Sequence, residues 1–98
     1  MIIKLIDSAE DDLVEGYHFY ERKAEGLGNY FLDSLFSDIA SLHIYAGIHS
    51  QHLGYYRLLA KRFPFAVYYK LEEKEIRVYA ILDCRRNPAW IRKKLSSN

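Results

Sequence analysis

Cysteine, proline and long hydrophobic runs are scarce in this sequence. The 98 residues include one cysteine and two prolines. One cysteine excludes a disulfide framework and fits a reducing compartment, so we expect a cytoplasmic protein. No apolar run approaches the ~20 residues that a membrane-spanning helix requires, so we expect no membrane contact. The first residues, MIIKLIDSAEDD, turn acidic at Asp7, unlike a signal peptide or a transit peptide.

Apolar and aromatic residues are plentiful, and the charges are unevenly distributed. Half of the residues are hydrophobic and 15% are aromatic, which predicts one folded domain over residues 1–98. The net charge is +1, but residues 1–49 carry a balance of −6 and residues 50–98 a balance of +7. This asymmetry indicates either a basic surface on one side or two halves that attract each other within the fold, and the two interpretations are compatible.

The hydrophobic periodicity predicts an α+β domain with the element order βααβββα. We expect strands at 2–6, 55–63, 65–71 and 76–82, and helices from Ser8 to about Gly26, from 29 to 46 and from 88 to 95. Ser8 resembles a helix N-cap, and Asn87 with Pro88 is typical of a helix start. The two long helices are joined by a short break, Leu27-Gly28, so they should form an antiparallel hairpin. Residues 48–54 are expected to form a polar loop.

Alternation along the strands separates two faces of the sheet. The side expected to pack under the helix hairpin comprises Phe65, Val67, Tyr69, Leu71, Ile76, Val78, Ala80 and Leu82. The helices should bury Ala9, Leu13, Tyr17, Tyr20, Ala24, Phe31, Leu35, Phe36, Ile39, Leu42 and Ala46 against it. The opposite side collects Arg57, Lys61, Tyr68, Lys70, Arg77, Tyr79 and Asp83. We expect that side to be basic, aromatic and open to water.

The segment ILDCRRNPAW, residues 81–90, is the candidate site. Arg85 and Arg86 stand where a strand ends and a helix begins. A helix N-terminus has unpaired N–H groups and partial positive charge, so cations there are unfavourable unless an anion compensates them. Adjacent guanidinium groups at such a position predict a phosphate or carboxylate site. The alternative is an ion pair with an acid of the first helix, Asp11 or Glu15.

Other residue patterns carry less chemistry. His43, His49 and His52 lack a cysteine or acid that would complete a metal-ligand set, so we expect no metal and no cofactor. Cys84 has adjacent arginines that would depress its pKa, but no histidine lies at a spacing typical of a nucleophile. Trp90 is expected to anchor the last helix on the core.

Three stretches resemble the RelE/ParE superfamily of bacterial type II toxins. They are the EGLG break within YERKAEGLGNYFLDSL, the R-x-x-x-x-x-F-P-F/Y-x-x-x-Y run at 57–69, and the RRNP stretch near the end. The resemblance extends from the first strand to the last helix and is greatest to the ParE-like branch, which includes plasmid stabilisation proteins. It implies the same βααβββα fold.

The resemblance implies a growth-inhibiting toxin that a small cognate antitoxin neutralises. Operator DNA would be bound only through that antitoxin. ParE-like members inhibit DNA gyrase, whereas RelE-like members cleave mRNA on the ribosome. Both possibilities stay open, together with a degenerate member that binds antitoxin without toxicity.

The resemblance also assigns candidate site residues. Arg57, Lys61 and Arg86 match basic residues that hold phosphate in RelE-like nucleases, and Arg85 is expected to support target or anion binding. Three departures argue against RNA cleavage. Ala66 stands where RelE has a further arginine, and Asp83 stands where many relatives have histidine. No residue matches the C-terminal tyrosine of RelE. Beside two arginines, Asp83 should have a low pKa and be a poor base.

Overall fold

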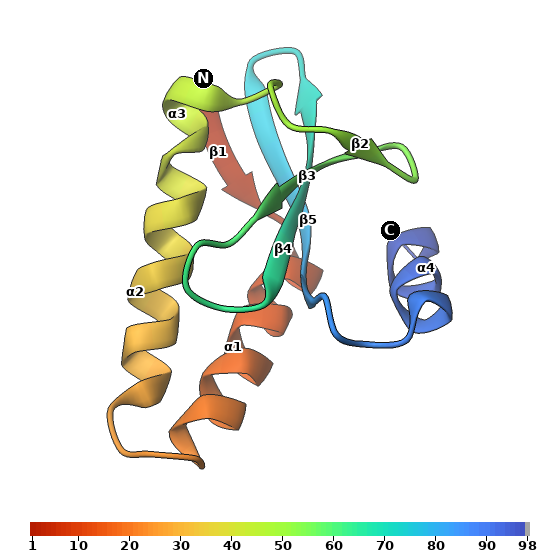
Figure 1. Ribbon diagram of the computed structural model, residues 1–98. Coiled ribbons are helices and arrows are strands. Elements are labelled where there is room, and N and C mark those ends of the chain that lie inside the picture. Colours follow the sequence, from red (N-terminus) through yellow and green to blue (C-terminus); the bar gives the residue numbers. More distant parts are fainter. Residues whose placement is uncertain (98) are drawn as a thin grey trace.

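A five-stranded sheet with helices on both faces forms the protein, and the computed structural model describes residues 1–97 (Figure 1). In chain order the elements are β1 (Ile2–Leu5), α1 (Asp7–Glu21), α2 (Leu27–Ala40), α3 (Leu42–Tyr45), β2 (Gln51–His52), β3 (Tyr55–Leu59), β4 (Phe65–Glu72), β5 (Glu75–Asp83) and α4 (Pro88–Ser96). The predicted α+β class is confirmed, and the order βααβββα is supplemented by the short α3 and β2. None of the described helices is long and apolar enough to span a bilayer.

The sheet has the order β1-β5-β4-β3-β2. Strand β1 runs parallel to β5, and the other neighbours are antiparallel. Between β4 and β5 the chain turns through Glu73 and Lys74, and Glu73 has a positive φ of 43°. The predicted charged hairpin is therefore confirmed, although it has no Asn-Gly turn.

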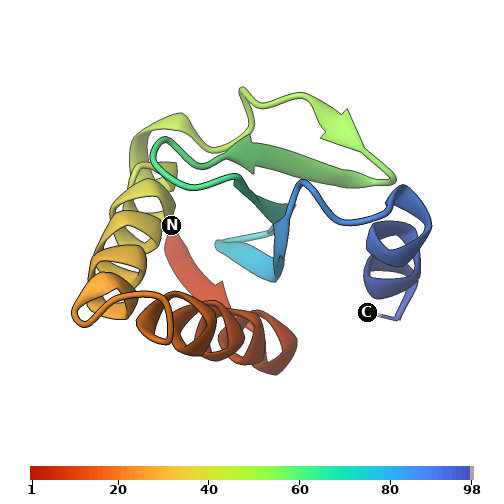
Figure 2. The ribbon, with the colours of Figure 1, turned by 60° about the horizontal axis from the view of Figure 1, so that its bottom comes forward.

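Helices α1 and α2 form the predicted antiparallel hairpin and cover one face of the sheet (Figure 2). Two glycines let the helices approach closely. A Cβ on Gly16 would lie 2.5 Å from the Phe31 ring, and one on Gly28 would lie 2.7 Å from the Tyr17 ring. The Phe31 ring is completely buried and stacks against Tyr20. Close contact between the helices thus seals the main hydrophobic core.

A register shift between β4 and β5 changes which side chains face that core. Tyr69 pairs with Val78, but Tyr68 pairs with Ala80, so Tyr79 is an extra residue on β5. An extra residue inverts the alternation beyond it. Ile81 therefore joins Val78 in the core under the hairpin. The prediction that Ala80 and Leu82 share the face of Ile76 and Val78 is wrong, since both pack on the other side of the sheet.

The C-terminal helix α4 covers part of the second face, where a smaller hydrophobic cluster forms. Its buried members are Tyr55, Ala66, Tyr68, Ala80, Leu82, Ile91 and Leu95. The Tyr55 hydroxyl donates a 2.9 Å hydrogen bond to the Leu95 carbonyl. The side chain of Asn87 accepts from the backbone N–H of Ala89, which confirms the predicted N-cap. The expectation that this face is open to water is wrong where α4 lies on it.

Several predicted boundaries of the helix hairpin are also wrong. Ser8 is not an N-cap, because α1 already begins at Asp7. The break between the helices precedes Leu27, where Gly26 adopts φ of 86° and the Glu21 carboxylate accepts from the N–H groups of Gly26 and Gly28. The second helix ends at Ala40 instead of 46, and a turn separates it from α3.

A few residues expected in the core lie on the surface. Ala24 lies beyond the end of α1, Phe36 is 49% exposed on α2, and Leu71 is 40% exposed near the end of β4. The strand predicted at 55–63 ends at Leu59, and the loop predicted at 48–54 contains the short strand β2.

Candidate functional site

The site is built on the edge of β5 that lies beyond the end of β1. Strand β1 ends at Leu5 and leaves the last residues of β5 without a strand on that side. Helix α1 supplies side chains instead. Ser8 Oγ donates 2.8 Å to the Tyr79 carbonyl, and Asp12 Oδ2 accepts 2.9 Å from the Ile81 N–H. Residues four apart lie on the same side of a helix, so one stripe of α1 completes the sheet edge.

Asp12 is a buried carboxyl at the centre of this edge. It is only 6% exposed, and burial raises its pKa from 3.8 to about 6. The hydrogen bond from Ile81 and the charge of Lys94 on α4 oppose that rise. Lys94 Nζ lies 3.9 Å from Asp12 Oδ1. One carboxyl therefore connects α1, β5 and α4.

Beyond β5 the chain turns sharply through Asp83 and the two arginines. Asp83 Oδ1 accepts from the backbone N–H of Arg85 at 2.8 Å and from its Nε at 3.0 Å, while Oδ2 accepts from its Nη2 at 2.7 Å. This paired contact lowers the pKa of Asp83, as predicted, and raises that of Arg85. The suggested partners of the arginines, Asp11 and Glu15, are wrong for Arg85, because an acid two residues away is nearer.

Arg86 is arranged differently from Arg85. Its guanidinium carbon lies 3.8 Å from the centre of the Trp90 ring, as in a cation–π stack. Within residues 1–97 it makes no hydrogen bond or ion pair with another side chain. Stacking holds the plane of the guanidinium and leaves its edge donors for another molecule. Arg86 also immediately precedes Asn87, the N-cap of α4.

A groove of about 750 Å³ lies between α1 and this corner. Arg85, Arg86 and Trp90 line it, together with Arg22, the residue that caps the C-terminal end of α1. Its remaining lining includes Asp12, Val14, Glu15, His18, Phe19, Phe65, Ile81, Leu82 and Asp83. The groove thus combines an apolar floor with guanidinium groups at its margin.

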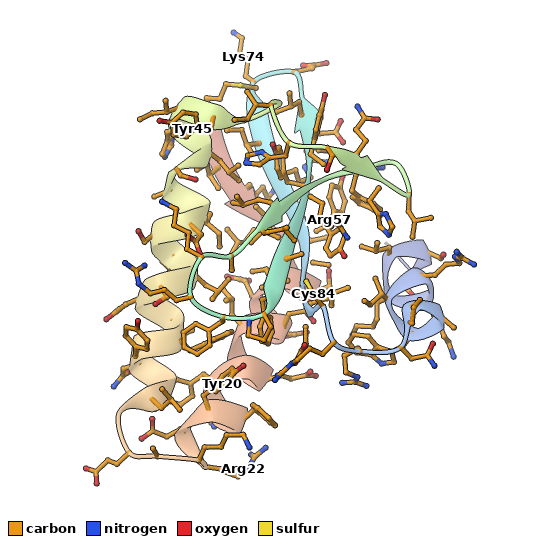
Figure 3. The ribbon with its side chains drawn as sticks, in the orientation of Figure 1. Tyr20, Arg22, Tyr45, Arg57, Lys74 and Cys84 are labelled. Carbon is orange, nitrogen blue, oxygen red and sulfur yellow. The ribbon has the colours of Figure 1, made fainter. Side chains whose placement is uncertain are left out.

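Arg57 does not line the groove, although it lies close to the same corner. It is half-buried on β3, opposite Tyr68, and its Nε is buried with no hydrogen-bond partner in the described chain. Figure 3 shows Arg57 on β3 and Cys84 just past the end of β5. The charge of Arg57 opposes the rise in pKa that burial causes at the Cys84 thiol and the Tyr68 hydroxyl. Arg57 is therefore a half-buried cation, close to groups of the second face.

Lys61 is not brought to the other candidate residues. It lies in the loop after β3, and its backbone N–H donates 3.2 Å to Asp38 Oδ2 of α2. The loop is therefore fastened to the helix hairpin. Of the four predicted residues, the structure groups Arg85 and Arg86, places Arg57 nearby and separates Lys61.

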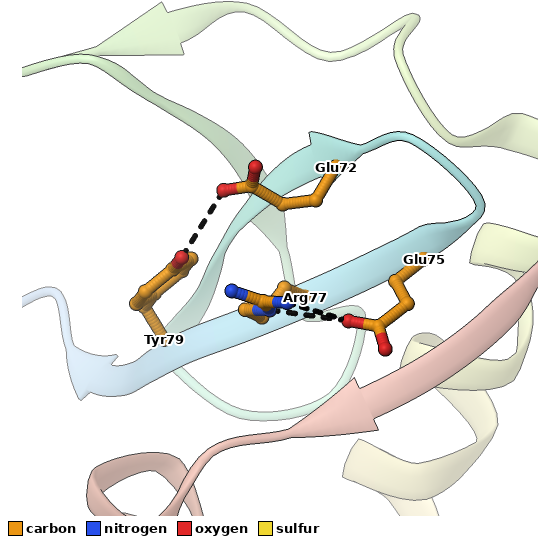
Figure 4. A network of polar contacts seen from close by, with 4 residues as sticks. All are labelled: Glu72, Glu75, Arg77 and Tyr79. Carbon is orange, nitrogen blue, oxygen red and sulfur yellow. Dashed lines mark hydrogen bonds and ion pairs between the residues drawn. The ribbon is translucent and has the colours of Figure 1, made fainter.

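Other cations on the second face are already engaged. Arg77 Nη2 lies 2.8 Å from Glu75 Oε2, and the Tyr79 hydroxyl donates to Glu72 Oε1 at 3.2 Å (Figure 4). Lys70 Nζ lies 4.7 Å above the Tyr55 ring. The predicted basic and aromatic character is present here, but acids on the same hairpin compensate part of the charge.

Cys84 and His49 lie in surroundings that shift the pKa values of both side chains. Cys84 is exposed, but its pKa is raised rather than depressed, with partial burial as the largest cause. His49 contacts the buried Tyr69 hydroxyl, and burial lowers its pKa. No three His, Cys, Asp or Glu side chains within residues 1–97 are grouped to hold a metal ion.

Asp12 is the residue of the site that sequence reasoning missed. The sequence does indicate that Asp12 is buried, because it lies three residues after Ala9 and four after Ser8, on the buried stripe of the helix. An acid on such a stripe predicts a backbone partner, but the partner on β5 is distant in sequence.

No known protein family's sequence profile matches the chain, and no curated protein sequence matches it. A solved structure described as the chromosomal ParDE TA system from P. aeruginosa contains a chain with the same arrangement, at a TM-score of 0.69. The two chains share one fold. They are 24% identical, and the alignment covers 83% of this chain and 92% of the chain from the ParDE system. The fold implied by the resemblance to RelE/ParE toxins is therefore confirmed.

Proposed function

We propose that this chain is the toxin component of a type II toxin–antitoxin module of the ParE kind. What carries the proposal is the fold shared with a chain of a ParDE toxin–antitoxin system over most of both chains. The EGLG break and the RRNP corner support it, since both are conspicuous in the structure as the helix connection and the margin of the groove. A cognate antitoxin would neutralise the protein in the cytoplasm, and operator DNA would be bound through that antitoxin.

The proposed mode of action is binding to a macromolecular target such as DNA gyrase. Arg86 is the first candidate for the contact, because stacking on Trp90 orients a guanidinium without an acidic partner within residues 1–97. An anionic group of the target would accept its hydrogen bonds. The ion pair between Arg85 and Asp83 holds the turn that carries Arg86, and the half-buried Arg57 adds positive charge next to Cys84.

The geometry favours binding over catalysis. Asp83 is engaged by Arg85, and its lowered pKa makes it a weak base. Lys61 does not line the groove of Arg86, and its backbone N–H is held by Asp38 of α2, which argues against one phosphate bound by all three cations of the nuclease hypothesis. A ribosome-dependent mRNA nuclease is therefore the alternative outcome of the experiment below.

The experiment compares two activities of one purified protein. Inhibition of gyrase supercoiling with intact mRNA in a translation reaction is the expected result. Arg86→Ala should weaken inhibition about tenfold or more, because a hydrogen bond to a charged group is lost. Arg92→Ala is the matched control, since it removes an exposed arginine from α4, the helix that begins just after Arg86.

Three outcomes would contradict the proposal in different ways. Cleavage of mRNA that depends on Arg86 would identify a nuclease. Equal effects of the Arg86 and Arg92 variants would refute the role of the stacked guanidinium. Unchanged growth on expression without a partner would indicate a chain that has lost toxicity.

A further inference from the structure

The indole ring of Trp90 connects the Arg86 guanidinium to a second cation on α4. The guanidinium carbon of Arg86 lies 3.8 Å from the centre of the ring, and Lys94 Nζ lies 5.6 Å from it. Both distances are within the range of a cation–π contact. Lys94 Nζ also lies 3.9 Å from Asp12 Oδ1 on α1. A continuous series of contacts therefore leads from the buried Asp12 to the stacked Arg86.

The Asp12 carboxyl also bridges the two elements that flank the arginine corner, residues 84–87. Strand β5 leads into this corner and α4 follows it. Asp12 Oδ2 accepts from the Ile81 N–H near the end of β5, while Oδ1 faces Lys94 on α4. Both ends of the corner are therefore attached to one side chain.

The negative charge of Asp12 is unfavourable for folding, and its hydrogen bond does not require it. The pKa of Asp12 is raised to about 6, chiefly by burial and further by the charges of Asp11 and Glu15 on the same helix. The causes that oppose this rise are the Ile81 N–H on β5 and Lys94 on α4. An amide oxygen could accept from that N–H, so of the two opposing groups only Lys94 requires a charge. A buried charge with a specific partner, in a groove, is typical of a functional site.

We propose that Asp12 is a positioning residue of the arginine corner, whose carboxylate holds Lys94 beside Trp90 and thereby fixes the ring on which the Arg86 guanidinium stacks. This inference rests on the proposed function for the use of Arg86, and it adds a dependence on pH. With a pKa of about 6, Asp12 is mostly ionised at neutral pH and mostly protonated below that value. Anion binding by Arg86 should therefore weaken as the pH falls through about 6.

A purely electrostatic effect of Asp12 would have the opposite sign. Asp12 lines the same groove as Arg86, so its negative charge repels an anion bound there, and protonation alone would strengthen binding. Two other titratable groups line the groove. Asp83 stays ionised, because its contact with Arg85 lowers its pKa. His18 is an imidazole, a group that titrates between about pH 5 and 8, so His18→Gln is the control for its contribution.

The first measurement follows Trp90, the single tryptophan of the chain, in the free protein. Its emission should change with a midpoint near the Asp12 pKa of about 6, because the cation beside the ring moves when Asp12 titrates. Asp12→Asn and Lys94→Met should each remove this transition. The exposed neighbours supply matched controls, Asp11→Asn and Lys93→Met, which should retain it, as should His18→Gln. Circular dichroism confirms that each variant is folded at every pH used.

The second measurement compares gyrase inhibition with stability at neutral pH. Asp12→Asn should weaken inhibition about two- to fivefold, the factor that a partly exposed ion pair can contribute, while it stabilises the fold. Lys94→Met should weaken inhibition by a similar factor but destabilise the fold, because the buried carboxylate loses its cation. The double variant should weaken inhibition no more than either single variant. A merely structural role of Asp12 would change inhibition and stability in the same direction.

Three results would overturn the proposal. One is a Trp90 transition that persists in Asp12→Asn. Another is unchanged inhibition by Asp12→Asn, and the third is stronger inhibition, which would assign to Asp12 only the repulsion of an anion. If the native protein does not inhibit gyrase, the proposed function fails, but the Trp90 transition still decides whether Asp12 positions the corner. The two failures are therefore distinguishable.

Discussion

Replacing Asp12 by asparagine should stabilise the protein at neutral pH. The carboxyl has a pKa of 3.8 in an unperturbed chain and about 6 in the folded protein. The folded state therefore prefers the protonated form, whose contribution to stability is complete below pH 3.8 and is lost as the pH rises through about 6. Asparagine has nearly the same shape, can still accept from the Ile81 N–H and does not ionise.

The size of the effect follows from the shift in pKa. A shift of about two units corresponds to roughly 3 kcal/mol, an upper value because charge effects near the surface are screened. The gain in unfolding free energy from Asp12→Asn should therefore grow by about 2–3 kcal/mol between about pH 4 and pH 7.5. Urea unfolding at several pH values, followed by circular dichroism and Trp90 fluorescence, measures it.

The control and the refuting result are both specific. Asp11→Asn changes an exposed neighbour on the same helix and should alter stability by less than about 0.5 kcal/mol at each pH. A gain from Asp12→Asn that stays constant with pH would refute the raised pKa. A gain that decreases as the pH rises would mean that the Ile81 N–H and Lys94 outweigh the cost of burying the charge.

Three further substitutions examine the packing around the sites. Gly16→Ala should lower the free energy of unfolding by about 1–3 kcal/mol, and with it the melting temperature, because the new methyl overlaps the Phe31 ring. An unchanged or raised melting temperature would contradict the close helix contact. Asn87→Ala should lower the free energy of unfolding by about 1 kcal/mol and increase amide hydrogen exchange in α4, since the Ala89 N–H loses its acceptor. Amide exchange equal to that of the native protein would exclude the capping role of Asn87. Tyr69→Phe should cost about 1–2 kcal/mol in urea unfolding, because the N–H of Gly47 loses its acceptor; a neutral result would indicate that water replaces the hydroxyl.

Much of the fold could be predicted from local patterns. The helix hairpin follows from apolar spacing on both sides of Gly26, and α4 follows from Asn87 with Pro88. The prediction of faces worked along β4 but failed at the end of β5. There, one extra residue at Tyr79 inverts the alternation, and no residue type in β5 marks the shift.

Only part of the candidate site could be predicted, because the partners of its side chains depend on contacts made in the folded chain. Two adjacent arginines before a capped helix are visible in the sequence, so the corner was found. Their different partners were not, because Arg85 turns back to Asp83 while Arg86 extends over Trp90. Arg57 and Lys61 were expected on one face, but the strand ends at Leu59 and the following loop crosses to α2.

The sequence by itself determined the class of fold, the order of the elements and the position of the arginine corner, because these depend on periodicity and capping over a few residues. Tertiary structure decided which charges remain available. It buried Asp12 against β5, paired Arg85 with Asp83 and left Arg86 stacked on Trp90. Those outcomes depend on distances between side chains that the chain brings together only when it folds.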